Sequence, residues 1–394
     1  MLKNQDIICI AGADWDNPLW TNRQHIMSRL SQQNRILYVE SLGLRQPSVN
    51  AKDLSRILGK LGRLFRNIKV KGNGLFVYTP LLIPFYQFEY IRRLNDLILI
   101  HDIKKICKDL QFNKPILWSY LPNAINLVGK MGEKLVIYHC VDDLSTIKGY
   151  PMKVVSEIEK RFIQKVDIVI VTSKKLYEDK RHMNLNTYYL PNVADASHFM
   201  LALDEMTSLP QDIVKIPKPR IGYVGNLVDS KVDIKLIKYI AESHPEWSII
   251  IIGPIWAGNK DANRLIEAIG NEKNIYCLGL KPYVELPKYI KSLDICMLPH
   301  KITEYSVSSF PIKFHEFMAT GKPIVSTDLP ALEDYKDIIW MAKDYPDFVK
   351  GISFLLNYDS ETMKAKRVEI ACQNTWEHRI ESISNIIERT LFHG

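Results

Sequence analysis

The residue types and the spacing of Lys313 and Glu316 suggest a binding or catalytic role. They lie in the segment Ser306–Thr327, which predicts a loop, a short helix, a tight stop and a buried strand. Residues three apart share one helix face. The helix start after Pro311, at Ile312, offers unpaired N–H groups to an anion, and Lys313 adds a full charge. Glu316 can accept hydrogen bonds from a diol. This set suits a sugar nucleotide, with its diphosphate at the helix start and its ribose on Glu316. The alternative is an ordinary, weakly stabilising surface pair.

The same segment carries a longer pattern, P-x-K-x-x-E-x-x-A-x-G-x-P-I-V, which runs from Pro311 to Val325. It resembles the donor-site signature of the GT-B glycosyltransferases. The resemblance is closest to family 4, in the branch that builds bacterial envelope polysaccharides such as teichuronic acid. The family's E-x7-E pair is incomplete, because Ser308 stands where the first glutamate is usual. That glutamate often contacts the donor sugar in the family. The resemblance implies retention at the anomeric carbon, while the missing glutamate leaves inversion open.

A second donor-side position follows the predicted strand Arg220–Gly225. Asn226 stands where the family usually has a phosphate-binding arginine, and Lys231 matches the family's companion lysine. The resemblance therefore implies that Lys231 and Lys313 neutralise the leaving diphosphate without a metal or other cofactor. The alternative for Lys231 is an ordinary loop lysine.

Three residues of the first half lie at the end of the predicted strand Leu135–Tyr138. His139, Asp142 and Asp143 are expected at a carboxyl edge of a parallel sheet, where ligands bind in such folds. We predict them as acceptor-side catalytic residues, with Asp142 or Asp143 as general base. The alternatives are a core histidine and helix-capping aspartates.

The loop after the first predicted strand, Ile7–Ala11, is a further candidate. We predict that it faces the acceptor, with a tryptophan stacking on sugar or lipid; its candidate residues are Gly12, Asp14, Trp15 and Asp16. The alternative is that its tryptophans only cover the core. Asp14-Trp15-Asp16 also matches the D-x-D metal motif of GT-A enzymes, but it follows the first strand, where that fold does not usually place it. We therefore expect no metal site.

A basic amphipathic pattern covers residues 52–71. Its apolar residues form one helical stripe, and basic residues surround it. Such a segment is typical of a helix on an anionic membrane, and we predict membrane contact through four residues: Arg56, Lys60, Arg63 and Arg66. The alternative is a helix packed on its own sheet with a solvated basic face.

Composition bounds the fold. The 394 residues are 46% hydrophobic with a net charge of +8, which suits two globular domains and an anionic partner. No apolar run is long enough to span a bilayer, and the N-terminus does not read as a signal peptide. Six scattered cysteines predict reduced thiols, with four of them buried in strands: Cys9, Cys140, Cys277 and Cys296.

Strands alternate with helices throughout, which predicts an α/β protein with parallel sheets. With the resemblance, we expect the GT-B fold, two Rossmann-like domains facing a central cleft. Residues 1–198 would bind the acceptor and residues 199–375 the donor, with a C-terminal helix at 376–391 packing back on the first domain.

The function expected is transfer of a hexosyl unit from a nucleotide sugar, UDP-linked, to a glycan or lipid-linked glycan in envelope polysaccharide synthesis. The expected location is cytoplasmic, peripheral on the inner face of the plasma membrane, with no nucleic-acid partner. The alternatives are a UDP-sugar 2-epimerase of GT-B fold and a non-catalytic polysaccharide-assembly subunit with a degenerate donor site.

Overall fold

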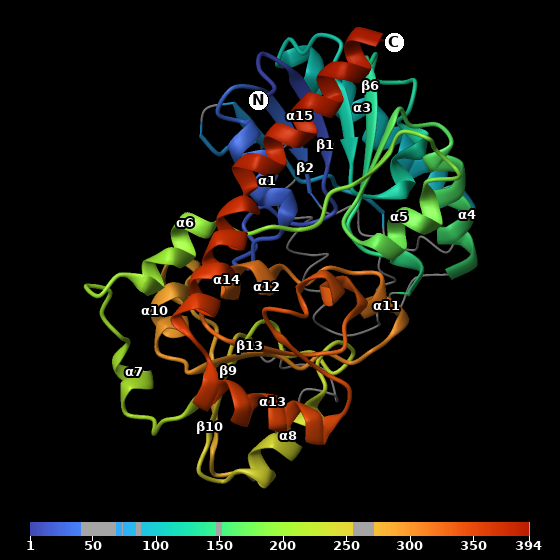
Figure 1. Ribbon diagram of the computed structural model, residues 1–394. Helices are drawn as coiled ribbons and strands as arrows, with labels where there is room; N and C mark the ends of the chain where they lie inside the picture. The colour runs from blue at the N-terminus through green and yellow to red at the C-terminus, as the bar shows by residue number, and fades with distance from the viewer. Residues whose placement is uncertain (41–67, 73, 84–87, 147–151, 255–271, 394) are drawn as a thin grey trace. The chain divides into compact units, whose positions relative to one another are not determined.

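The computed structural model describes residues 1–40, 68–72, 74–83, 88–146, 152–254 and 272–393 (Figure 1). The chain divides into two compact units. Unit 1 comprises Met1–Pro191 and Ile380–Gly394, and unit 2 comprises Asn192–Arg379.

Unit 1 is built on an eight-stranded sheet in the order β3-β4-β2-β1-β5-β6-β7-β8. All neighbouring pairs are parallel except β3 with β4. The central strands are buried along their whole length, as the continuous apolar runs of the sequence predict for a sheet covered on both faces. The strands are β1 (Asp6–Ile10), β2 (Arg35–Val39), β3 (Lys69–Val70), β4 (Leu75–Tyr78), β5 (Ile116–Ser119), β6 (Leu135–Cys140), β7 (Ile168–Val171) and β8 (Thr187–Tyr189).

Helices connect these strands and bury one apolar stripe each. In α3 the buried stripe includes Ile91, Leu99, Ile103 and Ile106, and the last three join the same core cluster as the sheet. The described helices of unit 1 are α1 (Asn22–Leu30), α3 (Glu89–Asp109), α4 (Met152–Ile163) and α5 (Lys174–Lys180), with short 3₁₀ turns at Pro122–Asn126 and Leu144–Thr146.

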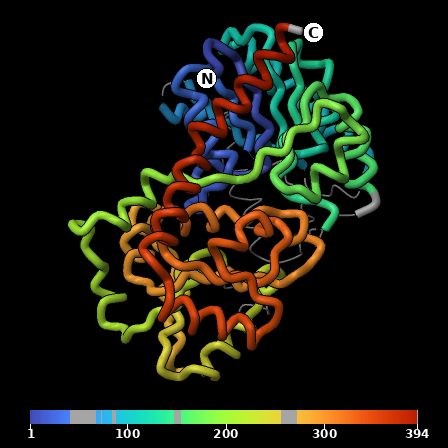
Figure 2. Tube along the Cα trace, in the orientation of Figure 1, coloured from blue at the N-terminus to red at the C-terminus, as the bar shows by residue number. Residues whose placement is uncertain are grey.

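The C-terminal helix α15 (Trp376–His393) contributes its later part to unit 1. The backbone N–H of Leu2 donates to the Ser384 hydroxyl at 2.9 Å, so this helix lies beside the N-terminal segment (Figure 2).

Unit 2 is built on a six-stranded sheet in the order β11-β10-β9-β12-β13-β14, and all of its neighbouring pairs are parallel. Separate clusters of buried apolar residues, one that includes Phe314 and Phe317 and one that includes Ile237 and Phe348, pack its helices on the sheet. The strands are β9 (Arg220–Val224), β10 (Ser248–Ile252), β11 (Ile275–Gly279), β12 (Ile295–Leu298), β13 (Ile324–Thr327) and β14 (Trp340–Ala342).

Helices of this unit follow or connect the strands, as the sequence predicts for an α/β domain. The described ones are α6 (Ala196–Phe199), α7 (Gln211–Val214), α8 (Ile234–Ser243), α10 (Leu286–Lys291), α11 (Glu304–Val307), α12 (Ile312–Ala319), α13 (Tyr345–Tyr358) and α14 (Glu361–Gln373), with 3₁₀ turns at Met200–Leu203, Tyr283–Glu285 and Pro330–Tyr335.

Two details differ from the sequence-based expectations. The domain boundary was predicted between residues 198 and 199, whereas the units separate between Pro191 and Asn192, because Ala196 and Phe199 belong to the apolar core of unit 2. Cys277 was predicted to be buried and is exposed, because β11 forms the edge of its sheet. The predicted α/β architecture with parallel sheets is confirmed.

Candidate active site

The Lys313–Glu316 pair lies on α12, whose other face is anchored in the core. Phe314, Phe317 and Met318 are fully buried there. Lys313 Nζ donates to Glu316 Oε2 at 2.5 Å, and the two side chains are 25% and 3% exposed. A carboxylate with so little exposure is not part of an ordinary surface pair. Burial raises the pKa of Glu316, while the Lys313 ammonium opposes that rise.

The start of α12 keeps its backbone donors available. Pro311 occupies the N-cap position, and no side chain caps the helix. The hydroxyl of the nearby Ser308 donates backwards to the Glu304 carbonyl at 2.9 Å. An uncapped helix start with a lysine in its first turn is suited to an anion.

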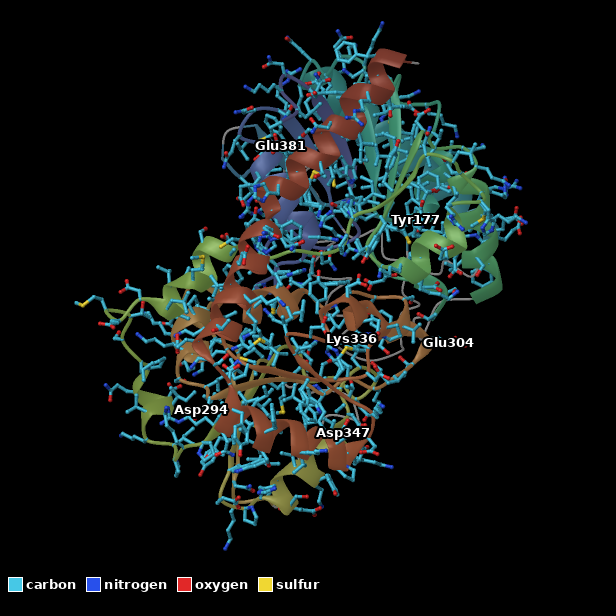
Figure 3. The ribbon with its side chains drawn as sticks, in the orientation of Figure 1. Tyr177, Asp294, Glu304, Lys336, Asp347 and Glu381 are labelled. Atoms are coloured by element: carbon cyan, nitrogen blue, oxygen red, sulfur yellow. The ribbon has the colours of Figure 1, made fainter. Side chains whose placement is uncertain are left out.

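Lys231 lies in the loop after β9 and is tied to the segment that precedes α12. Its Nζ donates to the Tyr305 hydroxyl at 2.7 Å and lies 4.3 Å from the centre of that ring. Its carbonyl accepts from Lys301 N at 2.9 Å, just beyond the end of β12. Tyr305 is in α11, the short helix before α12, so this hydrogen bond links Lys231 to the segment that leads into α12. Figure 3 labels Asp294 and Glu304, which mark the residue before β12 and the first residue of α11.

The Lys231 ammonium also affects the pKa of His300, which follows β12. Burial, with a smaller contribution from the Lys231 ammonium, lowers the pKa of His300 to about 4. The imidazole is therefore neutral at pH 7, and Lys231 supplies the positive charge of this pair.

Asn226 shows a feature that the sequence did not predict. Its side-chain oxygen Oδ1 is buried and has no hydrogen-bond partner among the described residues. Since buried acceptors are normally paired, a donor from a ligand would complete this position.

In unit 1, the three predicted catalytic residues have different environments. His139 is 2% exposed, lies within β6 and stacks on Tyr120 with ring centres 4.8 Å apart. Asp143 accepts from the backbone N–H and hydroxyl of Ser145 at 3.0 and 2.6 Å. These are the contacts of the alternatives, a core histidine and a capping aspartate. Asp142, half-buried in the loop after β6, is the remaining acid of the three.

The loop after β1 is held by polar contacts. Gly12 adopts φ +69°, and a Cβ there would lie 2.5 Å from a Leu121 methyl carbon, so this turn requires glycine. Trp15 is 7% exposed, donates its N–H to Glu40 at 2.9 Å and packs edge-on against Tyr38, so it covers the core. Trp20 is the exposed partner, 38% accessible and 5.6 Å from the Trp15 ring.

The two acids of the D-x-D match have different surroundings. Asp16 Oδ1 accepts from Lys71 Nζ at 2.6 Å, and this hydrogen bond lowers the pKa of Asp16. Asp14 is exposed. Within the described ranges, no group of three or more His, Cys, Asp and Glu side chains is placed to hold a metal ion.

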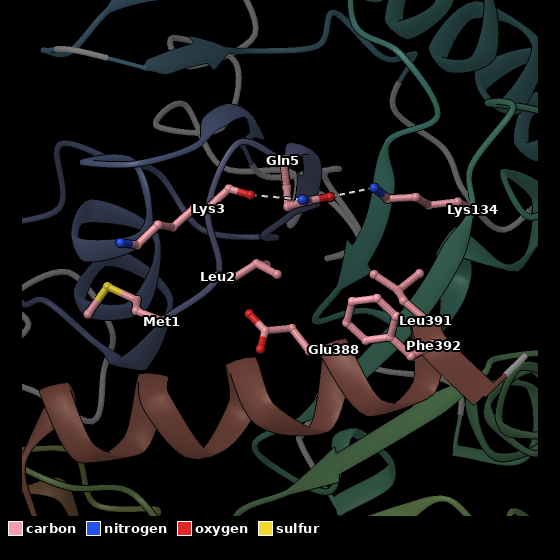
Figure 4. A pocket seen from close by; sticks show the side chains of 8 residues that line it. All are labelled: Met1, Leu2, Lys3, Gln5, Lys134, Glu388, Leu391 and Phe392. Carbon is pink, nitrogen blue, oxygen red and sulfur yellow. Dashed lines mark hydrogen bonds between the residues drawn. The ribbon is translucent and has the colours of Figure 1, made fainter.

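Each unit has a hollow at the amino ends of its strands, and the predicted site residues do not line either hollow. The one in unit 1 measures about 610 Å³ and includes Gln5 and Lys134, which immediately precede β1 and β6 (Figure 4). A groove of about 910 Å³ in unit 2 includes Lys218, Asp294 and Lys322, also at the amino ends of strands. Ligands of open α/β sheets bind at the carboxyl ends.

The predicted membrane contacts lie outside the described residues; they are Arg56, Lys60, Arg63 and Arg66. Among the helices that the structure does describe, none combines the length and apolar character required to cross a bilayer.

Comparison with known proteins shows what this chain is similar to. The model of the family "Glycosyl transferases group 1" matches residues 218–358, which contain Lys231, Lys313 and Glu316. The predicted resemblance is confirmed. The chain is also 26% identical over 275 residues to TuaH of Bacillus subtilis, named as a teichuronic acid biosynthesis glycosyltransferase, covering 66% of this chain and 68% of TuaH.

Solved structures agree on the fold. Sucrose-phosphate synthase from Thermosynechococcus elongatus has a TM-score of 0.71 at 15% identity, over 99% of this chain and 100% of that one. Alr3699/HepE from Anabaena, solved in complex with UDP, has a TM-score of 0.67 at 13% identity, over 97% and 100% of the two chains. These likenesses confirm the predicted GT-B fold.

Proposed function

We propose that this group 1 glycosyltransferase moves a hexosyl unit from a UDP-linked sugar to a glycan or lipid-linked glycan in envelope polysaccharide synthesis. The observation that carries the proposal is the buried Lys313–Glu316 pair at the uncapped start of α12, inside the family match. The name of TuaH supports the envelope pathway, and the UDP bound to HepE supports the donor class.

On the donor side, the diphosphate would lie at the start of α12, between Lys313 and Lys231. The backbone N–H groups that begin at Ile312, after Pro311, and the two ammonium groups would neutralise the charge that develops on the leaving diphosphate. This charge stabilisation would make a metal unnecessary, in line with the GT-B resemblance. Lys313 occupies only one oxygen of Glu316 in the described contacts, so the carboxylate can still accept hydrogen bonds from ribose hydroxyls.

On the acceptor side, the residues at the carboxyl edge of the unit 1 sheet would bind the incoming sugar. Asp142 or Asp143 would act as general base, and Asp143 also accepts two hydrogen bonds from Ser145. His139 and Tyr120 stack on each other at the same edge of the sheet. Exposed Trp20 offers a ring face of the kind on which sugars stack. The family resemblance favours a retained anomeric configuration, which the NMR coupling constant of the product would reveal.

The test is nucleotide binding by the whole chain. UDP, GDP and TDP are titrated by calorimetry with and without EDTA, on the wild type, on Glu316→Gln and on the control Glu333→Gln, whose carboxylate is exposed and pairs with Lys336. Binding of UDP that weakens at least about tenfold in Glu316→Gln, stays unchanged in the control and ignores EDTA supports the proposal. Metal-dependent binding would contradict the assignment of charge stabilisation to the lysines.

A second candidate function is a non-catalytic assembly subunit with a degenerate donor site. Asn226 and Ser308, which stand where the family usually has an arginine and a glutamate, favour it. Under this candidate no nucleotide binds even at millimolar concentration. Conversion of the UDP-sugar without any acceptor would instead identify an epimerase.

A further inference from the structure

Arg23 has an unusual environment for an arginine. It lies in the first turn of α1, and its Nε atom is buried without a hydrogen-bond partner among the described residues. No ion pair to Arg23 is found in that part of the chain. Its guanidinium carbon lies 5.3 Å from the centre of the Tyr120 ring. A guanidinium is always charged, so this position holds a half-buried positive charge, for which the Tyr120 ring is the contact found among the described residues.

The acids of the same sheet edge have other partners. Asp16 pairs with Lys71, and Glu40 accepts from the Trp15 N–H and the Thr79 hydroxyl. Asp143 accepts from Ser145. No ion pair joins these three carboxylates to Arg23.

The surroundings are arranged for a ligand at the carboxyl edge of the sheet. Tyr120 follows β5, and its N–H donates to the Ile10 carbonyl at the end of β1 at 2.9 Å. The Tyr120 side chain is 2% exposed, and its hydroxyl has no partner among the described residues. α1 has no acidic residue in its first turn, so its dipole adds positive potential beside Arg23. Arg23 itself is only half-buried, so a solute can reach it.

We infer that Arg23 binds an anionic group, a carboxylate or a phosphate, on the sugar that occupies the acceptor side of unit 1. The planar fork of the guanidinium matches both groups in two parallel hydrogen bonds, and the ring of Tyr120 fixes its orientation. The inference rests on the proposed function, because it names the acceptor of that reaction as a charged sugar.

The experiment measures sugar binding to the whole chain by ligand-observed NMR, with glucuronate, glucose 6-phosphate and neutral glucose as probes. We expect at least one charged sugar to bind at least about tenfold more tightly than glucose. The two charged probes separate a carboxylate from a phosphate as the recognised group. Arg23→Met removes the preference. Arg93→Met retains it, because Arg93 is 78% exposed on α3 and makes only a surface pair with Glu89.

Three outcomes would overturn the inference: no preference in the wild type, a preference that survives in Arg23→Met, or an equal loss in Arg93→Met, which would indicate general electrostatics. If Arg23→Met does not fold, Arg23→Lys keeps the charge without the fork and is expected to show a reduced preference; an unchanged preference there counts against the inference. UDP affinity is measured on the same samples. If the wild type binds UDP but shows no sugar preference, the inference about Arg23 is refuted and the proposed function is not. If the wild type does not bind UDP, the proposed function is refuted.

Discussion

Removing Lys313 would leave the Glu316 carboxylate buried without its cation. In Lys313→Met, Glu316 either stays charged at a high cost or takes up a proton. Protonation sets a ceiling on that cost, because it costs about 1.4 kcal/mol for each pH unit above the ordinary pKa of 4.5. The ceiling is about 3 kcal/mol at pH 7 and below about 1 kcal/mol at pH 5. The loss of unfolding free energy in the variant should therefore grow with pH.

The direction in which stability changes with pH follows from the direction of the Glu316 pKa shift. Burial holds the pKa of Glu316 above its unfolded value, so the folded state binds more protons than the unfolded state between the two values. Stability contributed by the protonated group is present below pH 4.5 and is lost as the pH rises through the folded pKa. Lys313 limits this loss in the wild type, and the variant extends it to higher pH.

Urea unfolding from pH 5 to pH 8 measures the effect, and hydrogen exchange of the peptide that covers α12 assigns it to this helix. The double variant Lys313→Met/Glu316→Gln is the decisive control, because it lacks both charges of this pair, so the extra pH dependence that Lys313→Met adds should disappear in it. A loss in Lys313→Met that does not vary with pH, or that persists undiminished in the double variant, would refute the account of a desolvated carboxylate held by its lysine.

Three further predictions concern other positions. Lys231→Met should weaken UDP binding at least about tenfold by calorimetry, whereas Lys336→Met, at an exposed pair, should not; equal effects would contradict a local role. His315 is fully buried with both ring nitrogens unpartnered among the described residues, and burial lowers its pKa to about 3. Its contribution to stability is therefore lost as the pH falls below about 6.5, by about 2–3 kcal/mol at pH 4.5, and His315→Phe should flatten this part of a urea-melt pH profile. Sedimentation with vesicles containing anionic lipid should fall when four basic residues are changed to glutamine, and unchanged sedimentation would favour a segment packed on its own sheet; these are Arg56, Lys60, Arg63 and Arg66.

The sequence predicted the secondary structure well because that information is local. The apolar run Ser248–Ile252 became a central buried strand, and the parallel α/β architecture followed from such runs alternating with helices. Errors arose where a distant segment decides. Ala196 was assigned to the first domain by the predicted boundary after residue 198, yet it packs in the core of unit 2. Cys277 has the neighbours of a buried strand residue, but strand order leaves β11 at an edge.

The candidate site shows the same limit in chemical terms. A spacing of three residues puts Lys313 and Glu316 on one helix face whether that face is buried or exposed to solvent. The pattern could therefore predict their contact but not its strength. The apolar packing of α12 leaves the carboxylate 3% exposed, and this burial makes the pair sensitive to pH and to any anion that competes for Lys313. The sequence did not predict a role for Arg23, because no motif surrounds it. The structure brings the Tyr120 ring, which follows β5, next to its guanidinium and shows no counterion for it among the described residues.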